Sequence, residues 1–487
     1  MVKASASVEH VNYQADLVII GGGGSGLAAA VEGAEAGLKN IMVLESRPAP
    51  GGNTTFAGGM LAAETPLQQQ LGFDVSRDAV FNDLMNYAHW KPDAMLVRSL
   101  VDLSTDNIRW LEEKGVTFNT LIPHYPNQKL MTYHACQGPK RTGALIVKGL
   151  LDSCKRLGVN VLCDTAAQNI LTAAVGGVKG VSAVNKEKHI HIDAPRVIIA
   201  TGGFAGNSQM MRRWLPFYHD EMQLRGLPHR GDGILLAADA GAATGGGITL
   251  EAEGPAFSGS KHLEVMVKRP TTIWVNKLGE RFTNEAALSV NEAANAIYNQ
   301  PGKVGYTLID EAIKTQNIQQ DLSPFENMLL DQEVWRSGAD SAFEEQINAG
   351  NVIRAMSWSD IAAWIGADPA LLRNTIDTYN SHCRIGHDKY FLKDSRCLLP
   401  LTKPPFYAIP GNIQLLVTHG GIRTNHRLAV LNEAEQPIHG LYAAGDDTHG
   451  RMGDTYHIRL SGLSLCFAIG SGRLAGRNAA ADAKSKG

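Results

Sequence analysis

This 487-residue sequence has no long uninterrupted apolar stretch. No segment reaches the roughly eighteen consecutive apolar residues from which a membrane-spanning helix is inferred. The first fourteen residues, MVKASASVEHVNYQ, also contain no apolar core of the length that a signal peptide needs. We therefore expect a soluble, cytoplasmic protein that makes no contact with a membrane.

A strong excess of charge of one sign is also missing. The 45 Lys and Arg residues are balanced by 48 Asp and Glu residues, which gives a formal net charge of -3, and no long run of either sign occurs. Nucleic acids and anionic membranes are bound by clusters of basic residues. We therefore expect no nucleic-acid partner, and the ligand class that remains is a small-molecule substrate.

Cysteine motifs are absent as well. The six cysteines are scattered, without a C-x-x-C or C-x-x-C-H arrangement. Haem attachment, iron–sulfur clusters and structural zinc sites depend on such spacings. The sequence therefore predicts reduced thiols and no metal site.

Glycine, in contrast, is abundant, with 51 residues, and its first cluster lies in a recognisable context. Residues 16–45 read as a buried strand, a glycine turn, a helix of small residues and a second strand that ends in an acid. The spacing of Gly21, Gly23 and Gly26 allows a tight turn, close approach of a pyrophosphate and close packing of the helix on the strand. Glu45 lies 19 residues beyond Gly26, where a carboxylate can accept hydrogen bonds from ribose hydroxyls. This pattern predicts a dinucleotide site.

Two later segments extend this prediction. Pro48–Met60 is again rich in glycine, and Val159–Ala200 consists of short alternating runs typical of a small antiparallel insertion. That insertion returns to an apolar strand at Arg196–Ala200. The strand ends on Thr201 and Gly202, where we expect a cofactor to approach.

The chain divides into three parts by composition. Residues 247–404 hold several helical patterns and most of the tryptophans, and residues 405–487 resume the character of the first 246. This arrangement predicts an α/β fold in which a Rossmann-like nucleotide-binding domain, formed by 1–246 and 405–487, carries an inserted α+β domain at 247–404 that caps the substrate.

Seven motifs occur in a fixed order along the chain: VIIGGGGSGLAAA, GGNTTFAGGM, IIATGGFAGN, GDGI, WVNKLGERFTNEA, HGGIRTN and GLYAAGDDT, the last followed by RLSGLSL. In these motifs the chain resembles the flavoprotein family of fumarate reductases and succinate dehydrogenases. Its soluble relatives include 3-ketosteroid dehydrogenases, urocanate reductase and tricarballylate dehydrogenase.

The resemblance implies that the dinucleotide is FAD. Gly21, Gly23 and Gly26 would cradle its pyrophosphate, and Glu45 would hold the adenosine ribose. Further positions that match the family's flavin-binding residues are Gly51, Gly52, Asn53, Thr54, Gly58, Gly59, Asp232, Asp446, Ser464 and Leu465.

Three of these positions carry a specific expectation. Ser464 and Leu465 open the last helix, whose amides would face the flavin and stabilise its reduced, anionic form. Asn53 stands where covalently flavinylated members carry a histidine. We therefore expect FAD to be bound non-covalently.

For catalysis, Arg459 matches the arginine with which the family binds a substrate carboxylate, because a guanidinium can hold a carboxylate with two hydrogen bonds. The family's double histidine is reduced here to His419, shifted by two positions. The proton-donating arginine of fumarate reductases is also missing, since Ala287, Leu288 and Ser289 occupy its segment. The sequence therefore argues against a fumarate reductase of the standard type.

His419 is the candidate proton donor or acceptor, because a histidine pKa suits acid–base work near neutral pH. The alternatives are Tyr133, His134, Tyr456 and His457.

Three functions remain open. The first is an FAD-dependent oxidoreductase that reduces or desaturates the Cα–Cβ bond of an unsaturated carboxylate, with an external electron donor or acceptor. The second is a dehydrogenase of a steroid or cyclic ketone. The third is a flavin-binding redox subunit that turns over no substrate of its own.

Overall fold

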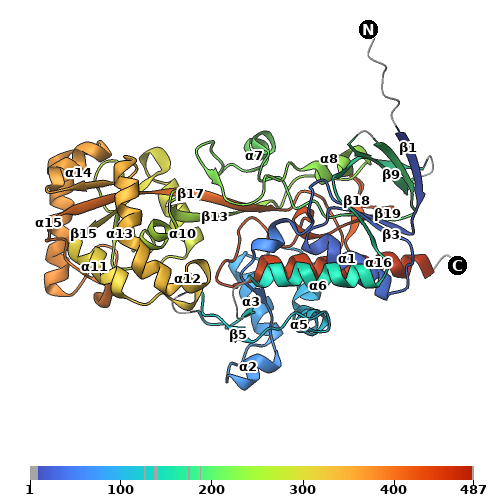
Figure 1. Ribbon diagram of the computed structural model, residues 1–487, viewed down its shortest axis with the longest axis horizontal. Coiled ribbons are helices and arrows are strands. Elements are labelled where there is room, and N and C mark those ends of the chain that lie inside the picture. The colour runs from blue at the N-terminus through green and yellow to red at the C-terminus, as the bar shows by residue number, and fades with distance from the viewer. Residues whose placement is uncertain (1–8, 126–127, 137–140, 174–175, 187, 485–487) are drawn as a thin grey trace, which may run out of the picture.

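The computed structural model describes residues 9–125, 128–136, 141–173, 176–186 and 188–484. The molecule is elongated, with two bodies at opposite ends of its long axis (Figure 1). One body holds the N-terminal segments together with the C-terminal helix, and the other holds the elements coloured yellow to orange. None of the helices in the described part is long and apolar enough to cross a membrane.

A six-stranded sheet forms the centre of the first body, in the order β18-β19-β11-β2-β3-β7. Adjacent strands of this sheet are parallel, except for the antiparallel pair of β18 and β19. Both faces of the sheet are covered, and its central strands are completely buried, which explains why they read as unbroken apolar runs. The strands are β2 (Leu17–Ile20), β3 (Ile41–Leu44), β7 (Asn160–Leu162), β11 (Val197–Ile199), β18 (Ala429–Leu431) and β19 (Pro437–Ala443).

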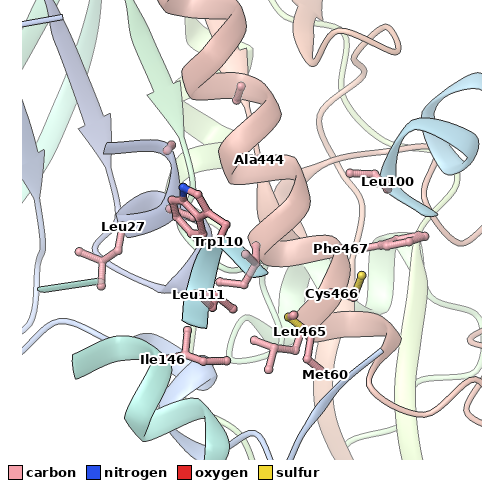
Figure 2. Close-up of a cluster of buried hydrophobic side chains, with 14 of the residues drawn as sticks. Leu27, Met60, Leu100, Trp110, Leu111, Ile146, Ala444, Leu465, Cys466 and Phe467 are labelled. Carbon is pink, nitrogen blue, oxygen red and sulfur yellow. The ribbon is translucent and has the colours of Figure 1, made fainter. Parts of the chain in front are cut away.

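Helices α1 (Gly24–Glu35) and α16 (Leu463–Lys484) pack against each other at very short range. A Cβ atom on Gly472 would lie 2.1 Å from the Ser25 carbonyl oxygen, and one on Gly476 would lie 2.4 Å from the Ala29 carbonyl oxygen. Only glycine permits this approach. Helix α6 (Thr142–Arg156) packs on α1 as well, and Figure 2 shows the apolar side chains that the helices bury together, including Leu27, Ile146 and Phe467.

The predicted antiparallel insertion is present as a four-stranded sheet with the order β1-β10-β9-β8. The pairs of β10 with β9 and of β9 with β8 are antiparallel, as expected. The edge strand β1, which pairs in parallel with β10, was not predicted. The strands of this four-stranded sheet are β1 (Glu9–Gln14), β8 (Thr165–Thr172), β9 (Val178–Asn185) and β10 (Lys188–Asp193).

Two long strands run between the two bodies (Figure 1). Strand β17 (Phe406–His419) pairs with β13 (Thr249–Ala256) near the first body and with β15 (Gly305–Asp310) and β16 (Ile353–Ala355) in the second. The domain boundaries predicted from the sequence lie directly before these two strands. Those boundaries stay a prediction.

The remaining elements cover the sheets or connect them. In the first body they are η1 (Gly52–Phe56), β4 (Met60–Leu61), α2 (Pro66–Gln70), α3 (Arg77–Tyr87), α4 (Ala94–Asp102), α5 (Ser104–Glu112), β5 (Thr120–Leu121), β6 (Tyr133–Ala135), α7 (Ser208–Trp214), β12 (Gln223–Leu224), α8 (Asp232–Asp239) and η4 (Gly445–Asp447). In the second they are α9 (Lys261–Met266), β14 (Ile273–Val275), α10 (Val290–Tyr298), η2 (Pro301–Lys303), α11 (Glu311–Gln319), α12 (Pro324–Leu329), α13 (Gln332–Asn348), α14 (Trp358–Ile365), α15 (Pro369–Ile385) and η3 (Ser395–Cys397).

Candidate functional site

A cavity of about 540 Å³ opens at the carboxyl ends of strands β2, β3 and β11. Ligands of α/β sheets bind at this edge because the loops that follow the strands converge there. Ten of the residues predicted to bind the cofactor line the cavity: Gly21, Gly23, Glu45, Gly52, Asn53, Thr54, Thr201, Gly202, Asp232 and Asp446.

The glycine turn at the cavity has the shape that a pyrophosphate requires. A Cβ atom on Gly23 would meet nothing within 4 Å, because Gly23 faces the open cavity. A Cβ atom on Gly26 would instead lie 1.9 Å from the Gly21 carbonyl oxygen, so this glycine lets α1 pack on β2. The free amides at the start of α1 and its dipole favour an anion in this position.

Glu45 is buried at the end of β3 and organises the turn around it. Its Oε2 accepts from the Gly22 amide at 2.9 Å, and its Oε1 accepts from the Arg47 amide at 2.9 Å. A carboxylate oxygen can accept more than one hydrogen bond, so ribose hydroxyls can still bind here. The residues present at this edge therefore fit a dinucleotide.

The second glycine segment contributes to the cavity in only part of its length. Asn53 Oδ1 accepts from the Leu227 amide at 2.8 Å, and Thr54 Oγ1 accepts from the Gly24 amide at 3.2 Å. Gly51 adopts a φ of 126° and donates its amide to the Gly22 carbonyl, which joins this segment to the first glycine turn. Gly51 is not among the residues that line the cavity.

Gly58 and Gly59 also lie outside the lining of this cavity, against Tyr133. A Cβ atom on Gly58 would lie 2.5 Å from the Tyr133 hydroxyl, and one on Gly59 would lie 2.6 Å from the His134 carbonyl oxygen. These glycines therefore permit close packing within the protein. Their contact with the cofactor stays a prediction.

The turn after β11 is held by a carboxylate that the sequence analysis did not single out. The buried Asp447 accepts from the amides of Thr201, Gly202 and Gly203 and from the Thr201 hydroxyl. The Thr201 side chain thus points to Asp447, and this network fixes the turn at the wall of the cavity.

The start of helix α16 does not line the cavity. The Ser464 amide donates to the Tyr456 hydroxyl at 3.3 Å, and Leu465 is buried in the apolar cluster of Figure 2. A flavin contact at Ser464 and Leu465 therefore stays a prediction.

His419 lies at the end of β17 inside a buried cluster of charged groups. Its Nδ1 is 3.0 Å from Asp446 Oδ1, and its Nε2 is 3.3 Å from Glu251 Oε2. Arg451 Nη2 donates to Asp446 Oδ1 at 3.1 Å and lies 3.2 Å from His419 Nδ1. The ring of Tyr456 stacks on the imidazole at 5.2 Å. His419 therefore has a partner on both nitrogens, and Tyr456 covers one face of its ring.

The ionisation of this cluster follows from burial and from its charges. Burial lowers the pKa of His419, but the carboxylates of Asp446 and Glu251 outweigh it and raise that pKa above its ordinary value. Burial raises the pKa of Asp446, but His419 and Arg451 hold it well below its usual range. Burial raises the pKa of Glu251, and the contact with His419 only partly offsets this shift. The surroundings thus shift the pKa values of His419 and Glu251 upward and that of Asp446 downward.

Arg459, the predicted carboxylate-binding residue, lies at the contact between the two bodies. Its Nη2 donates to Glu292 of α10 at 2.8 Å and to the Ala287 carbonyl at 3.5 Å. The Arg459 side chain is 41% exposed. Within the described chain, its Nε and Nη1 atoms have no hydrogen-bond acceptor.

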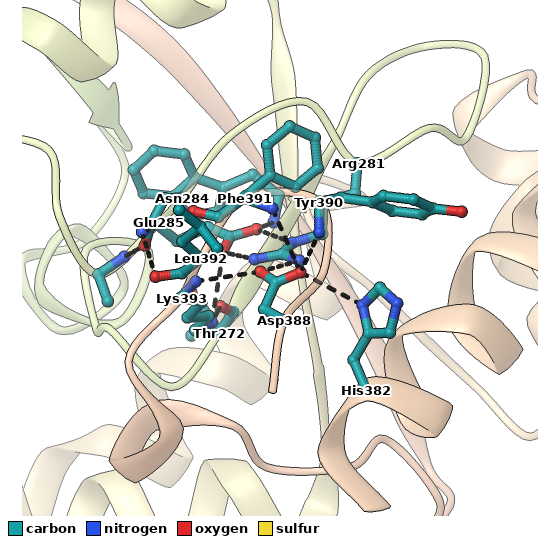
Figure 3. Close-up of polar contacts among 12 residues, drawn as sticks. Thr272, Arg281, Asn284, Glu285, His382, Asp388, Tyr390, Phe391, Leu392 and Lys393 are labelled. Carbon is teal, nitrogen blue, oxygen red and sulfur yellow. Dashed lines mark hydrogen bonds and ion pairs between the residues drawn. The ribbon is translucent and has the colours of Figure 1, made fainter. Parts of the chain in front are cut away.

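The WVNKLGERFTNEA motif serves the packing of the second body. Arg281 binds both Glu285 and Asp388, and Lys393 binds Glu285 at 3.3 Å (Figure 3). These four side chains are almost completely inaccessible to solvent. The network fixes the chain just before Ser289, where α10 begins, and so positions Glu292 opposite Arg459.

The alternative acid–base residues differ in their surroundings. Both nitrogens of His134 are bonded, to Thr65 Oγ1 and to the Thr132 carbonyl, and burial lowers the pKa of His134 to about 4. His457 Nε2 lies 2.8 Å from Asp83 Oδ2, whereas its buried Nδ1 has no partner in the described chain. Both nitrogens of His134 are therefore used in hydrogen bonds within the protein, whereas His457 retains one nitrogen without a partner among the described residues.

Aromatic side chains gather at the junction of the two bodies. His124 stacks on Tyr125 at 4.0 Å and on Tyr133 at 5.5 Å, and it also packs on Phe325 of α12. The Tyr125 hydroxyl is buried without a partner among the described residues. The junction thus has an aromatic wall.

Sequence reasoning missed Glu251, Glu292, Arg451 and Asp447, as well as His229 in the cavity wall. Only Asp447 had a signal, because it follows Asp446 in the GLYAAGDDT motif. Glu251, Glu292 and His229 come from segments that are distant in the sequence, and Arg451, five residues after Asp446, belongs to none of the motifs.

Comparison with known proteins agrees with this geometry. The family model described as FAD binding domain matches residues 16–465. The chain is 29% identical to the vinyl phenol reductase of Lactiplantibacillus plantarum over 97% of both chains. It is also 29% identical to the NADH:fumarate oxidoreductase of Klebsiella pneumoniae, over 99% of this chain but only 50% of that protein. The present chain thus spans about half the length of that relative.

A solved structure has a similar fold. The 3-ketosteroid-Δ4-(5α)-dehydrogenase of Rhodococcus jostii RHA1 is 25% identical over 96% of this chain and 97% of its own, with a TM-score of 0.75. These findings confirm the predicted resemblance to the fumarate reductase family and the predicted α/β fold around an FAD-binding domain.

Proposed function

We propose that this chain, which belongs to the FAD binding domain family, is an FAD-dependent oxidoreductase that acts on the Cα–Cβ bond of an unsaturated carboxylate. One observation carries the proposal. Asp446 lines the cofactor cavity and also binds both His419 and Arg451. The cofactor site and a cluster of acid–base and cationic groups therefore share a residue.

The cofactor-binding roles follow from the cavity. Gly21 and Gly23 would admit the pyrophosphate, Glu45 would accept from the ribose, and Asp446 would accept from the ribityl chain. When bound, FAD supplies the chemistry of hydride transfer to or from a carbon atom. The absence of a histidine at Asn53 supports non-covalent binding.

Arg459 would hold the substrate carboxylate. Its Nη2 is engaged by Glu292, so the carboxylate would bind to the remaining Nε and Nη1 donors. A guanidinium carries five N–H donors and can serve both partners. The ion pair with Glu292 would keep the arginine oriented while the substrate enters.

The proton needed at the second alkene carbon would come from the cluster around His419. Hydride adds to one carbon as the π bond breaks, and the electron pair left on the other carbon takes a proton. Since both nitrogens of His419 are occupied, we infer that Glu251 passes on the proton and that His419 restores it. A carboxyl group whose pKa is raised by burial suits this step.

The electrons would come from an external donor. The names of two relatives, NADH:fumarate oxidoreductase and NADH:acrylate oxidoreductase, include NADH, and each is about twice as long as this chain. A cytoplasmic location would give access to such a reductant, and cell fractionation would test it.

Flavin reoxidation tests the proposed function. The purified holoenzyme is reduced without oxygen and mixed with a panel of enoates, vinylphenols and enones. Fast return of the flavin absorbance with an enoate supports the proposal. No reaction with any enoate would sink it.

A steroid or cyclic ketone is the second candidate substrate. The aromatic wall of His124, Tyr125 and Tyr133 favours it, because flat rings pack well on such side chains. Reoxidation by enones alone would select this function. Reoxidation by no compound of the panel would favour a redox subunit without turnover.

A further inference from the structure

Arg451 is a buried cation with unused hydrogen-bond donors. Its side chain has 0% solvent exposure, yet its Nε and Nη1 atoms have no acceptor among the residues that the structure describes. Only Nη2 is bonded, to Asp446 Oδ1 at 3.1 Å and to His419 Nδ1 at 3.2 Å. Leaving donors of a buried charged group unpaired is costly, so such an arrangement indicates a missing partner.

The charges around Arg451 indicate the sign of that partner. Asp446 Oδ1 is shared between Arg451 Nη2 and His419 Nδ1. One carboxylate oxygen therefore serves both groups, and the other donors of the charged guanidinium have no acceptor among the described residues. An anionic oxygen is the acceptor that such donors bind most strongly.

The position of Arg451 relates this anion to the reaction. Asp446 connects it to the cofactor cavity, and His419 connects it to Glu251, the proposed source of the proton. Arg459, in contrast, is 41% exposed and already paired with Glu292. Arg459 and Arg451 are thus separate cationic positions, one at the contact between the bodies and one buried beside Asp446 of the cavity wall.

We propose that Arg451 binds an anionic oxygen of the substrate at the inner end of the active site. This oxygen belongs to an anionic group other than the carboxylate that Arg459 would hold: a second carboxylate in an unsaturated dicarboxylate, or the phenolate in a hydroxylated styrene. Since guanidinium nitrogens only donate, either oxygen would satisfy them. This inference deepens the proposed function and rests on it.

The test measures binding without turnover. Oxidised holoenzyme is titrated with the saturated dicarboxylate succinate and, at pH 9, with 4-cyanophenolate, and binding is followed through the flavin absorbance and by calorimetry. Arg451→Met should weaken the preferred anion roughly 10- to 100-fold, and Arg451→Lys should weaken it less. The preferred ligand distinguishes a carboxylate from a phenolate.

Arg473→Lys is the matched control. Arg473 is equally buried but fully paired with Glu32, Asn107 and Asp106, so its replacement should leave anion binding unchanged. If Arg451→Met does not fold, Arg451→Lys and Arg451→Gln replace it in the titration.

The possible outcomes separate this inference from the proposed function. Unchanged anion affinity in the Arg451 variants would overturn the inference, even if the enzyme reduces enoates. The inference would also be overturned if the unaltered protein bound no anion. The same holds if the Arg451 variants lost FAD or had a shifted flavin potential while their anion affinity stayed unchanged. If anions bind through Arg451 but no alkene reoxidises the flavin, the inference stands and the proposed function fails.

Discussion

Arg459 Nη2 lies 2.8 Å from Glu292 Oε2, which joins the segment before the C-terminal helix to the first turn of α10. The two residues are 167 positions apart in the sequence. Glu292 also accepts from the Ser289 amide and so caps its own helix. The pair therefore couples the orientation of Arg459 to the position of the second body.

Replacing Arg459 tests its predicted role. Arg459→Met should raise the KM for an enoate roughly 10- to 100-fold, because a charge-assisted hydrogen bond to the carboxylate is lost. The KM for a neutral enone should stay unchanged. Steady-state kinetics with both substrates provide the measurement.

Arg423→Met is the control for this experiment. The Arg423 side chain is also 41% exposed, and it is paired with Glu435. An equal effect of the two substitutions, or none from Arg459→Met, would remove Arg459 from the substrate site.

Replacing each of two glycines of the first turn by alanine should have a different effect: one replacement weakens FAD binding and the other lowers stability. Gly23→Ala places its methyl group in the open cavity, so the apoprotein should fold normally but bind FAD at least about tenfold more weakly. Gly26→Ala places its methyl group 1.9 Å from the Gly21 carbonyl oxygen, which should cost about 1–3 kcal/mol of unfolding free energy. Thermal melting of the apoproteins and FAD titration separate the two effects. Tight FAD binding by Gly23→Ala would contradict the placement of the pyrophosphate.

Glu45 should contribute strongly to FAD affinity. Glu45→Gln keeps the shape but weakens the acceptors for the Gly22 and Arg47 amides and for the ribose, so the Kd for FAD should rise roughly tenfold or more. Asp16→Asn is the matched control, because Asp16 Oδ2 also accepts from two backbone amides but lies outside the cofactor cavity. Equal changes in the two variants would show a general structural effect.

FAD should separate from the denatured protein. Asn53 donates and accepts hydrogen bonds but is not a nucleophile, and it occupies the position expected for a flavin-linked histidine. Acid precipitation should therefore leave the yellow colour in the supernatant. Colour retained in the pellet would demonstrate a covalent link elsewhere in the chain.

Stability should fall as the pH drops below 6.5. Burial lowers the pKa of His124 to about 3 and that of His134 to about 4, from an ordinary value of 6.5. Between pH 6.5 and 4 the unfolded chain therefore binds protons that the folded chain does not. Each histidine should reduce the unfolding free energy by about 1.4 kcal/mol per pH unit in this window.

Denaturant unfolding at several pH values would measure this slope. In His134→Gln the slope should be smaller by about the contribution of one histidine. A slope that does not change with the substitution would mean that His134 is protonated in the folded state.

The sequence by itself determined the nucleotide-binding fold, and it predicted ten of the residues that line the cavity. The glycine turn, Glu45 and the strand before Thr201 are local features, because backbone conformation and strand–turn–helix order depend on neighbouring residues. The resemblance then identified the cofactor as FAD through motifs that are each continuous in the chain.

Only the tertiary structure decided which charged groups meet beside the cofactor. Glu251 reaches His419 because β13 pairs with β17, and Glu292 reaches Arg459 because the second body folds back on the first. Arg451 carries no motif, and its significance lies in being buried with unused donors. Burial and long-range pairing depend on the whole packed chain, so no local pattern in the sequence could reveal them.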